Sequence, residues 1–504
     1  MTSVFELLVD WWHIVIPIAI SGIELLALFS AWHAAMRVRT SQAAVAWAVS
    51  LVAVPVLILP LYWIFGRNRF GGYREAIRQV SAQHKSSVDA VRRELLTDRN
   101  VPSSFPASPL TRLADVLDTP VSSNNRFQLL VDGQQFFDEL IRLIDSAEHY
   151  LYVQFYIIRA DEVGQRFADA LCAQAQAGTV VRLLYDELGC ISLPRAYLHR
   201  LRQAGIEVQS FNTRQGWANR FQLNFRNHRK LLVVDGQRAL VGGLNIGNEY
   251  LGKLSWAKGW RDTALSMVGP VAKKLQAAFA SDYYWATRRD LPEAQWSDSP
   301  SSEVQQNDSH TAHSVESTSH EIRDGAVVCA TGPADVRNRA TMMFADVAST
   351  AQQRLWISTP YLVPDDACLI ALSMARARGV DVRLLIPSHP DQWLVYLAGF
   401  YYEQQLEAIG VAVYRYQPGF LHQKCVLADD RIVLIGSTNL DNRSLHLNFE
   451  LMVAANEPAL VQQAARMLEA DFAAARLTNE GQGRLIPWYI RVGTVVARLF
   501  SPIL

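Results

Sequence analysis

The stretch Gly178-Thr-Val-Val-Arg-Leu-Leu184 recurs in the second half of the chain as Gly379-Val-Asp-Val-Arg-Leu-Leu385. In both copies a helix-like pattern ends at the glycine, and an apolar run typical of a buried strand follows it. Further strand-like runs repeat in the same order, pairing Tyr150–Tyr156 with Arg354–Tyr361 and Gly205–Val208 with Gly410–Val413. Helices that alternate with short apolar strands predict an α/β fold with helices covering each sheet. We therefore expect the same topology in both copies of the repeat.

The 504 residues divide into five segments by composition and repeat. A chain of this length can form two or three domains. A stretch rich in Ser, Asn, Gln, Thr and His separates the two copies and cannot bury a core. We expect an apolar hairpin at 1–70, an amphipathic connector at 71–123, a domain at 124–290 (the first half), a flexible linker at 291–325, and a domain with a C-terminal amphipathic segment at 326–504 (the second half).

Two apolar stretches, Trp11–Trp32 and Ala43–Phe65, each approach the roughly 20 residues that a helix needs to cross a bilayer. Aromatic residues close their ends, as is typical at membrane interfaces. The stretches predict a transmembrane hairpin with two spans. A signal peptide is the alternative, but it needs a basic segment before its apolar core, and no Lys or Arg precedes Arg37.

Basic residues flank these stretches unequally. The short connection holds Arg37 and Arg39, whereas a larger cluster follows the second stretch, namely Arg67, Arg69, Arg74, Arg78 and Lys85. Because cytoplasmic loops carry the excess of Lys and Arg, this pattern favours a cytoplasmic body. The margin is modest, since the connection is itself basic.

The overall charge argues against a nucleic-acid partner. The formal net charge is +0, so the chain lacks the basic field with which such proteins neutralise phosphates. The five cysteines are scattered and never spaced C-x-x-C, which argues against a disulfide framework or a zinc ribbon.

A second repeat carries chemistry. His228-Arg-Lys230 with Asp235 recurs as His422-Gln-Lys424 with Asp429. Because side chains two apart share one face of a strand, each imidazole projects together with a lysine, while the residue between them points the other way. Each aspartate begins a turn-forming pair. The spacing is specific enough that two accidental copies are improbable.

A hairpin folded about these turns brings Gly243 opposite the first motif histidine and Ser437 opposite the second. Asn245 and Asn439 lie two residues further along. Each half thus gathers an imidazole, an ammonium and a carboxamide on one surface, with a hydroxyl added in the second half. We expect Asn245, Ser437 and Asn439 to bind phosphate oxygens.

Such a set suits a phosphodiester. The lysines neutralise its oxygens, and preorganised positive charge stabilises phosphoryl transfer. In-line displacement needs a nucleophile and a leaving-group acid on opposite sides of the phosphorus, which explains one site built from two halves. An ammonium beside each imidazole would repel a divalent cation, so no metal is expected.

These motifs resemble the phospholipase D superfamily, and more closely the bacterial cardiolipin synthases of the two-span type. The resemblance covers nearly the whole chain. It also includes Phe65–Arg69, Gly242–Asn245, Trp260–Asp262, Thr359–Pro364, Pro418–His422, Gly436–Asn439, Asn439–Ser444 and Asn448–Glu450.

The resemblance implies residue roles. One histidine becomes a phosphatidyl-enzyme intermediate and the other shuttles protons. The family's usual order assigns attack to His228 and acid–base work to His422, although the sequence alone does not fix that order. Orienting carboxylates map to Glu450 for His422 and to Asp262 for His228. Asp235 and the equivalent aspartate of the second motif are expected to hold the turns.

The implied reaction transfers a phosphatidyl group from one phosphatidylglycerol to a hydroxyl of another, giving cardiolipin and glycerol. No cofactor, metal or nucleotide is expected. The expected partners are phosphatidylglycerol and anionic membrane lipid, and the expected location is the bacterial inner membrane, with two spans.

Three alternatives remain. A hydrolytic phospholipase D, or a transfer to another headgroup alcohol, would use the same motifs. A nuclease is disfavoured by the neutral charge and the membrane anchor. A membrane scaffold with a dead site predicts decayed motifs, whereas all six principal motif residues are present.

The last residues form a basic amphipathic pattern. Arg484, Arg491 and Arg498 recur along one side of a predicted helix, and apolar residues such as Trp488 and Leu499 occupy another. The pattern fits either an interfacial helix on anionic lipid or an ordinary helix packed on the body.

Overall fold

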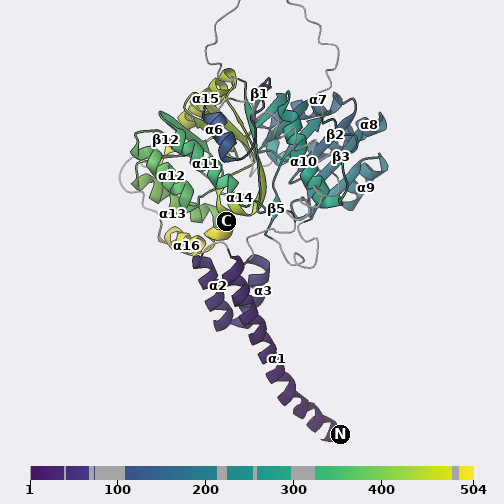
Figure 1. Cartoon of the computed structure of the whole chain (residues 1–504), viewed down its shortest axis with the longest axis vertical. Coiled ribbons are helices and arrows are strands. Elements are labelled where there is room, and N and C mark those ends of the chain that lie inside the picture. Colours follow the sequence, from purple (N-terminus) through teal and green to yellow (C-terminus); the bar gives the residue numbers. More distant parts are fainter. Residues whose placement is uncertain are drawn as a thin grey trace, which may run out of the picture.

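The computed structural model describes residues 2–38, 41–66, 73, 108–212, 224–253, 258–296, 324–478 and 487–504. Figure 1 shows a body of sheets and covering helices, and the apolar helices α1, α2 and α3 project from one end of it. Most of the expected connector (71–123) and linker (291–325) lies outside the described residues, so these two expectations stay predictions.

A seven-stranded sheet forms the first half, in the order β1-β8-β7-β6-β2-β3-β4. Strands β2, β3 and β4 run parallel, and the remaining neighbours are antiparallel. The elements are β1 (Arg126–Val131), α7 (Asp132–Asp145), β2 (Tyr150–Phe155), α8 (Glu162–Gln176), β3 (Val180–Asp186), α9 (Arg195–Gln203), β4 (Glu207–Phe211), β5 (Arg226–Asn227), β6 (Leu231–Val234), β7 (Arg238–Gly242), η2 (Asn248–Leu251), β8 (Thr263–Val268) and α10 (Val271–Thr287).

The second half repeats this plan. Its strands follow the order β18-β13-β12-β10-β14-β15-β17, and β9 pairs with β17. The elements are β9 (Ala326–Thr331), α11 (Arg339–Thr350), β10 (Arg354–Ser358), β11 (Leu362–Val363), α12 (Asp366–Ala377), β12 (Asp381–Pro387), α13 (Trp393–Ala408), β13 (Ala412–Tyr416), β14 (Cys425–Ala428), β15 (Ile432–Gly436), β16 (Leu440–Asp441), α14 (Asn442–His446), β17 (Asn448–Ala455), α15 (Pro458–Ala473), β18 (Ala475–Leu477), α16 (Trp488–Arg498) and η4 (Ser501–Ile503). Apart from the added edge strand β18, each strand of the first sheet has its counterpart at the same place, which confirms the repeated topology.

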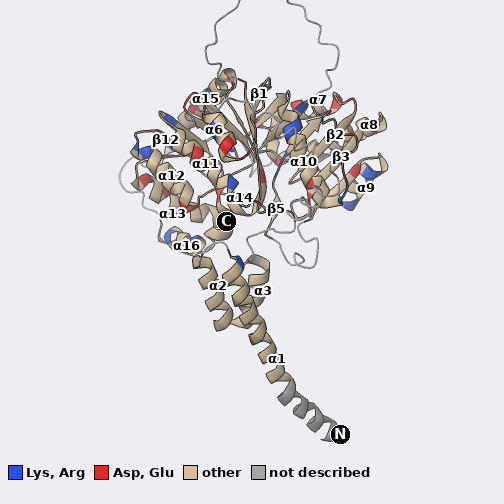
Figure 2. Cartoon of the chain, in the orientation of Figure 1, with Lys and Arg blue, Asp and Glu red and all other residues tan. Residues whose placement is uncertain are grey.

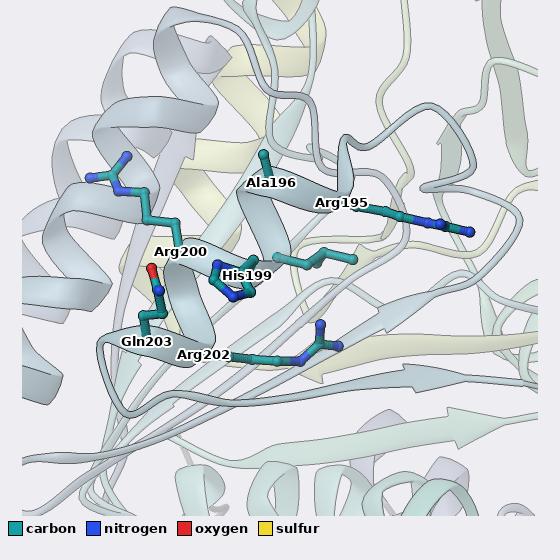
Figure 3. Close-up of a pocket in the computed structure, with 7 residues that line it drawn as sticks. Arg195, Ala196, His199, Arg200, Arg202 and Gln203 are labelled. Carbon is teal, nitrogen blue, oxygen red and sulfur yellow. The ribbon is translucent and has the colours of Figure 1, made fainter.

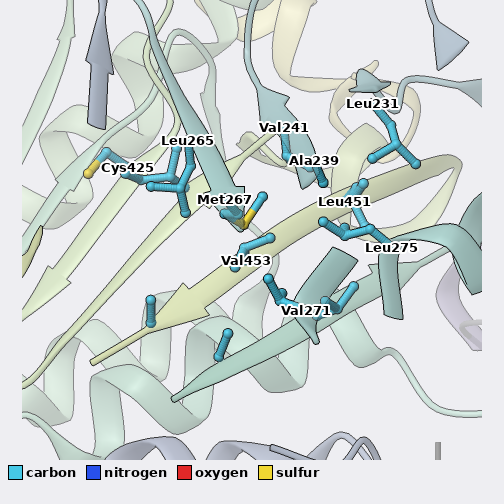
Figure 4. Close-up of a cluster of buried hydrophobic side chains, with 14 of the residues drawn as sticks. Leu231, Ala239, Val241, Leu265, Met267, Val271, Leu275, Cys425, Leu451 and Val453 are labelled. Atoms are coloured by element: carbon cyan, nitrogen blue, oxygen red, sulfur yellow. The ribbon is translucent and has the colours of Figure 1, made fainter. Parts of the chain in front are cut away.

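A shared apolar core joins the two halves. Figure 4 shows Val241, Leu265 and Met267 of the first half beside Leu451 and Val453 of the second. Each half also has a core of its own, in which α7, α8 and α9, or α11, α12 and α13, contribute buried side chains. Close packing of the shared core fixes the relative position of the two sheets.

The helix α6 (Pro109–Val116) precedes the first half in sequence but packs on the second. Leu110 and Leu113 are buried in the core of the second half. The Arg112 guanidinium lies 2.8 Å from a carboxylate oxygen of Asp346 on α11. The chain therefore contacts the second half before it enters the first.

The expected second span is broken into two short helices. The first helix, α1 (Thr2–Arg37), contains an apolar stretch long enough to cross a membrane, Val15–Arg37. The second apolar stretch forms α2 (Ser41–Ala53) and α3 (Pro55–Phe65) instead. Proline lacks a backbone N–H and disfavours the helical conformation of the residue before it, so the helix stops at Val54 (φ −140, ψ 64).

The chain also reverses at this break. Tyr62 Oη lies 2.6 Å from His33 Nδ1, and the Trp63 indole donates to Ser30 Oγ at 3.1 Å. A straight second span antiparallel to α1 would bring these aromatic residues to the N-terminal half of α1 rather than to its last turns. The second stretch therefore forms no continuous span-length helix: among the described residues one helix is long enough to span, and α2 and α3 fold back beside its C-terminal part (Figure 1).

Charge is distributed accordingly. The helices α2 and α3 contain no charged residue, and Figure 2 shows the Lys, Arg, Asp and Glu residues gathered on the body. The described part of the molecule thus consists of an apolar bundle and a charged, two-sheet body.

Candidate active site

His228 of the first half is held by the second half. The strand β5 pairs in parallel with β17, with Asn227 opposite Phe449. The His228 backbone N–H donates to the Phe449 carbonyl oxygen at 2.9 Å. The next residue, Glu450, places both carboxylate oxygens 3.0 Å from His228 Nδ1.

His422 of the second half is held by the first half in the same way. Its backbone N–H donates to the Arg261 carbonyl oxygen at 2.7 Å, and the Arg261 N–H donates to Phe420. The next residue, Asp262, places Oδ2 2.7 Å from His422 Nδ1. Each motif strand therefore runs past its own sheet and joins the other half.

This crossing corrects the expected carboxylate pairing. Glu450 was expected to orient His422, and Asp262 to orient His228; the hydrogen bonds show the reverse. Matching by sequence placed each carboxylate with the histidine of its own half. The exchanged backbone pairing brings it instead to the histidine of the other half.

The two motifs form one electrostatic site. The charge of Lys424 acts on His228, and the charge of Lys230 acts on His422. Glu450 and Asp262 each influence both lysines. All four motif side chains and both carboxylates therefore belong to a single centre.

Burial keeps both imidazoles neutral near neutral pH. It lowers the pKa of His228 to about 4, opposed by Glu450 and reinforced by Lys230. It lowers the pKa of His422 to about 3, with Lys424 reinforcing the shift. In His228 the carboxylate of Glu450 at Nδ1 favours a proton on that nitrogen, which leaves Nε2 with its lone pair free to react.

The lysines are buried as well. Lys230 Nζ donates to the His228 carbonyl oxygen at 2.6 Å, and Lys424 Nζ donates to that of His422. Lys424 Nζ also lies 2.7 Å from His422 Nδ1. Burial lowers the pKa of Lys424 to about 8 and moves that of Lys230 well below its ordinary value. The described residues hold no group of three or more His, Cys, Asp and Glu side chains arranged for a metal.

Comparison with known proteins places this site in a family. Residues 140–282 and 345–472 match the family described as "Cardiolipin synthase, PLD-like domain". The chain is 43% identical to cardiolipin synthase A of Pseudomonas aeruginosa (strain LESB58), over 96% of this chain and 95% of the relative. It is 40% identical to cardiolipin synthase A of Pseudomonas fluorescens (strain Pf-5), over 96% and 98%. The chain belongs to the cardiolipin synthase family.

The fold agrees with a solved structure. A phosphatidylserine synthase from Haemophilus influenzae Rd KW20 superposes with a TM-score of 0.59 at 18% identity, covering 78% of this chain and 99% of that one. This likeness supports the two-domain α/β fold of the cardiolipin synthase.

The two motif aspartates bind backbone N–H groups at the beginning of a neighbouring strand. Asp235 accepts hydrogen bonds from the backbone N–H groups of residues 148–150 at 2.8–3.0 Å. Asp429 accepts from residues 352–354 at 2.7–3.1 Å. Both have positive φ, 51 and 54. These contacts support the expected structural role of the two aspartates, which stays a prediction.

The hairpin register differs from the expected one by a residue. Val234 pairs with Arg238, and Ala428 pairs with Ile432, so each turn contains three residues rather than two. Continued from these pairs, the register sets Gly243 opposite residue 229 and Ser437 opposite residue 423. The left-handed conformation of the motif aspartates accommodates the longer turn.

The three expected phosphate ligands contact protein groups. Asn245 donates to Tyr250 Oη at 2.8 Å and accepts from the Ile157 N–H at 3.1 Å. Ser437 donates to Glu450 Oε2 at 2.5 Å. Asn439 Nδ2 lies 3.4 Å from an Asp441 carboxylate oxygen. These contacts support the site's framework, and phosphate binding by Asn245, Ser437 and Asn439 stays a prediction.

Sequence reasoning missed the residues behind the motifs. Asp282 of α10 accepts hydrogen bonds from Tyr73, Gln154, Asn227 and Arg229 at 2.7–2.8 Å. Arg229 is the middle residue of the first motif, so its side chain points away from His228, as strand alternation predicts. In the second motif the middle residue donates to an equivalent aspartate of α15. Matching buried aspartates in the two helices were the available signal.

Aromatic rings border the imidazoles. The Tyr156 ring centroid lies 5.0 Å from that of His228, and the Trp260 centroid lies 4.9 Å from that of His422. Such rings pack the histidines and limit water around them.

A shallow hollow elsewhere contains no motif residue. It lies over α9 and is lined by residues that include Arg195, His199 and Arg202 (Figure 3). Arg200, which also lines the hollow, pairs with Asp169. We assign this hollow no role in the reaction.

Proposed function

We propose that this chain is a cardiolipin synthase that transfers a phosphatidyl group from one phosphatidylglycerol to a hydroxyl of another and releases glycerol. The crossed pairs, His228 with Glu450 and His422 with Asp262, are the observation that carries the proposal. They give one centre two neutral imidazoles that are oriented at Nδ1 by opposite halves, in a pseudo-twofold arrangement.

In the first step, His228 Nε2 attacks the phosphorus of the donor lipid. A P–N bond forms, and the bond between phosphorus and the headgroup glycerol oxygen breaks. His422 gives the leaving oxygen a proton, so free glycerol departs. Glu450 stabilises the positive charge that develops on the attacking ring.

In the second step, His422 removes the proton from a headgroup hydroxyl of the acceptor lipid. That oxygen attacks the phosphorus and displaces His228, which gives cardiolipin and regenerates both rings. Lys230 and Lys424 neutralise the nonbridging oxygens throughout. A bilayer that supplies acceptor headgroups at high local concentration helps them compete with water.

The acid step depends on substrate charge. Burial in the free protein lowers the pKa of His422 to about 3, so the ring is neutral before the lipid binds. A phosphodiester anion placed beside the ring favours its protonated form and raises that pKa. Substrate binding therefore favours protonation of His422, and this proton is the one that the leaving glycerol takes up.

The proposed location is the bacterial inner membrane. In this topology α1 crosses once, and α2 and α3 enter the bilayer from the body side and return. Arg37, in the last turn of α1, then lies on the same side as the body. Because the sequence after α1 and after α3 is rich in arginine, the positive-inside rule favours a cytoplasmic body.

Product analysis tests the reaction. Detergent-solubilised protein is incubated with phosphatidylglycerol labelled in its acyl chains and in its headgroup, with a chelator present. Labelled cardiolipin with an equal amount of glycerol is expected. Phosphatidic acid as the main product would indicate hydrolysis, and no product would indicate a scaffold. The His228→Ala variant is the control for contaminating enzymes.

A further inference from the structure

One face of the C-terminal helix α16 packs on the body. It lies against α13, where a Cβ added at Gly493 would meet Leu397 at 3.2 Å. Ala497 on the same face is fully buried, with 0% exposed. The Arg498 guanidinium sits 3.8 Å from the centroid of the Tyr401 ring. These contacts fix the orientation of α16.

The opposite face of α16 is apolar and open. Trp488, Val492, Val495 and Leu499 follow each other at spacings of four, three and four, so they form one stripe along the helix. Their exposed fractions are 76%, 56%, 66% and 77%. Gly493 and Ala497 lie on the other side of the helix. The helix therefore has two opposite apolar faces, of which the body covers one.

A helix on a purely aqueous surface presents polar side chains outward. The outward stripe of α16 contains none. Basic residues lie beside it instead, since Arg491 and Arg498 are both exposed and both flank the stripe on one side. The third arginine of the sequence pattern, Arg484, lies outside the described residues. An apolar stripe with flanking arginines suits the boundary between acyl chains and anionic headgroups.

Figure 1 indicates which partner covers this stripe. The helix α16 lies at the end of the body from which α1, α2 and α3 project. A bilayer that holds the exposed apolar side chains of α1 and α2 therefore reaches the level of α16. We propose that α16 is a membrane-docking helix, with its stripe of Trp488, Val492, Val495 and Leu499 inserted among the lipids at the body-side surface.

The docked helix is coupled to the active site through Arg443. The Arg443 N–H donates to the Leu504 carbonyl oxygen at 2.7 Å, and its guanidinium donates to Ile503 at 3.2 Å, just beyond α16. The same guanidinium donates to the Asn224 carbonyl oxygen at 2.8 Å, four residues before His228. Docking of α16 thus fixes the height of the catalytic centre above the lipid surface.

A depth measurement tests the docking. All five native cysteines are buried, so a thiol-reactive fluorophore reports selectively on the introduced cysteine of Leu499→Cys. The labelled protein is reconstituted in vesicles of phosphatidylcholine and phosphatidylglycerol with brominated acyl chains. Strong quenching is expected for Leu499→Cys and for Leu28→Cys in α1. No quenching is expected for Gln462→Cys on α15, which is exposed at the opposite end of the body.

The outcomes separate this inference from the proposed membrane anchoring on which it rests. Quenching at residue 28 without quenching at residue 499 would overturn the docking and leave the anchor intact. Absence of quenching at both would overturn the anchor itself. In detergent, the reactivity of the cysteine at residue 499 towards the fluorophore could fall as the protein concentration rises. That result would assign the stripe to a second copy of the chain and overturn the lipid proposal.

A functional comparison gives a second readout. The variant Val492→Ser/Val495→Ser changes only exposed side chains, so it should fold and retain wild-type turnover in detergent micelles. In vesicles its KM for phosphatidylglycerol should rise several-fold while kcat changes little. Equal KM values for variant and wild type in vesicles would contradict a docking role.

Discussion

The two halves share a topology and exchange equivalent contacts, but they orient the histidines with different carboxylates. The first half offers Asp262 beside Gly243, and the second offers Glu450 beside Ser437. A Cβ at Gly243 would lie 2.2 Å from Asp262 Oδ1, whereas Ser437 donates to the longer carboxylate. Duplication therefore conserved the geometry around each imidazole and left the supporting chemistry to diverge.

The halves also differ at their lysines. Both lysines donate to the carbonyl oxygen of their own histidine, and Lys424 lies in addition 2.7 Å from His422 Nδ1. A cation beside the ring opposes protonation of His422 until an anionic substrate arrives. This difference favours His228 as the nucleophile and His422 as the group whose protonation follows substrate binding.

The largest effect is expected from removing either ring. His228→Ala and His422→Ala should each lower cardiolipin synthesis by about a thousandfold or more, because one step of the exchange then has no catalyst. After brief reaction with phosphatidylglycerol labelled at its phosphorus, alkaline quenching and peptide mapping should find the label on His228. A label on His422 would reverse the assigned order while keeping the two-ring mechanism.

Replacing each orienting carboxylate by an amide tests which histidine that carboxylate orients. Glu450→Gln and Asp262→Asn should each lower kcat by about 10- to 100-fold, as is typical for groups that orient a reactive imidazole. Glu450→Gln should change the rate at which diethyl pyrocarbonate modifies His228 and leave that of His422 unchanged. The opposite pattern would mean that each carboxylate serves its own half.

A matched control is available outside the site. Asp365 lies 3.1 Å from a ring nitrogen of His446, so Asp365→Asn also breaks a carboxylate–histidine pair. Synthesis by this variant should stay near the wild-type rate.

The glycine and the serine should respond unequally. Gly243→Ala places a methyl group against Asp262 and should cost about tenfold or more in kcat, similar to loss of the orienting carboxylate. Ser437→Ala removes the hydrogen bond to Glu450, worth about 1 kcal/mol, and the one that the hydroxyl accepts from the Leu451 N–H, and it should cost about fivefold in kcat. Equal losses in steady-state assays of the two variants would contradict the steric account of the glycine.

The last effect concerns pH. Burial lowers the pKa of Lys424 to about 8, so its ammonium is charged below that pH and neutral above it. The kcat/KM of the wild type should therefore fall above about pH 8, by about tenfold per unit, as phosphate stabilisation is lost. Lys424→Arg should remove this alkaline limb, since arginine stays protonated. Lys253→Arg, an exposed surface variant, should retain it.

Much of the fold followed from local pattern. The recurring glycine-to-strand stretches predicted repeated strands that alternate with helices, because hydrophobic periodicity and helix stops are local properties. The two apolar N-terminal stretches show the limit. Both have the composition of a span, but only Trp11–Trp32 lies within one continuous helix; in Ala43–Phe65 a proline allows reversal, and contacts with the end of α1 determine where the chain goes.

For the catalytic centre, the sequence by itself determined the two imidazoles and two ammonium groups by spacing within short segments, and the resemblance to the family pointed to the two carboxylates. Only the tertiary structure decided which carboxylate serves which histidine. Glu450 and His228 are 222 positions apart, and they meet because β5 leaves its own sheet to pair with β17. Pairing between distant strands depends on how the shared core docks the two halves, and no local pattern encodes that docking.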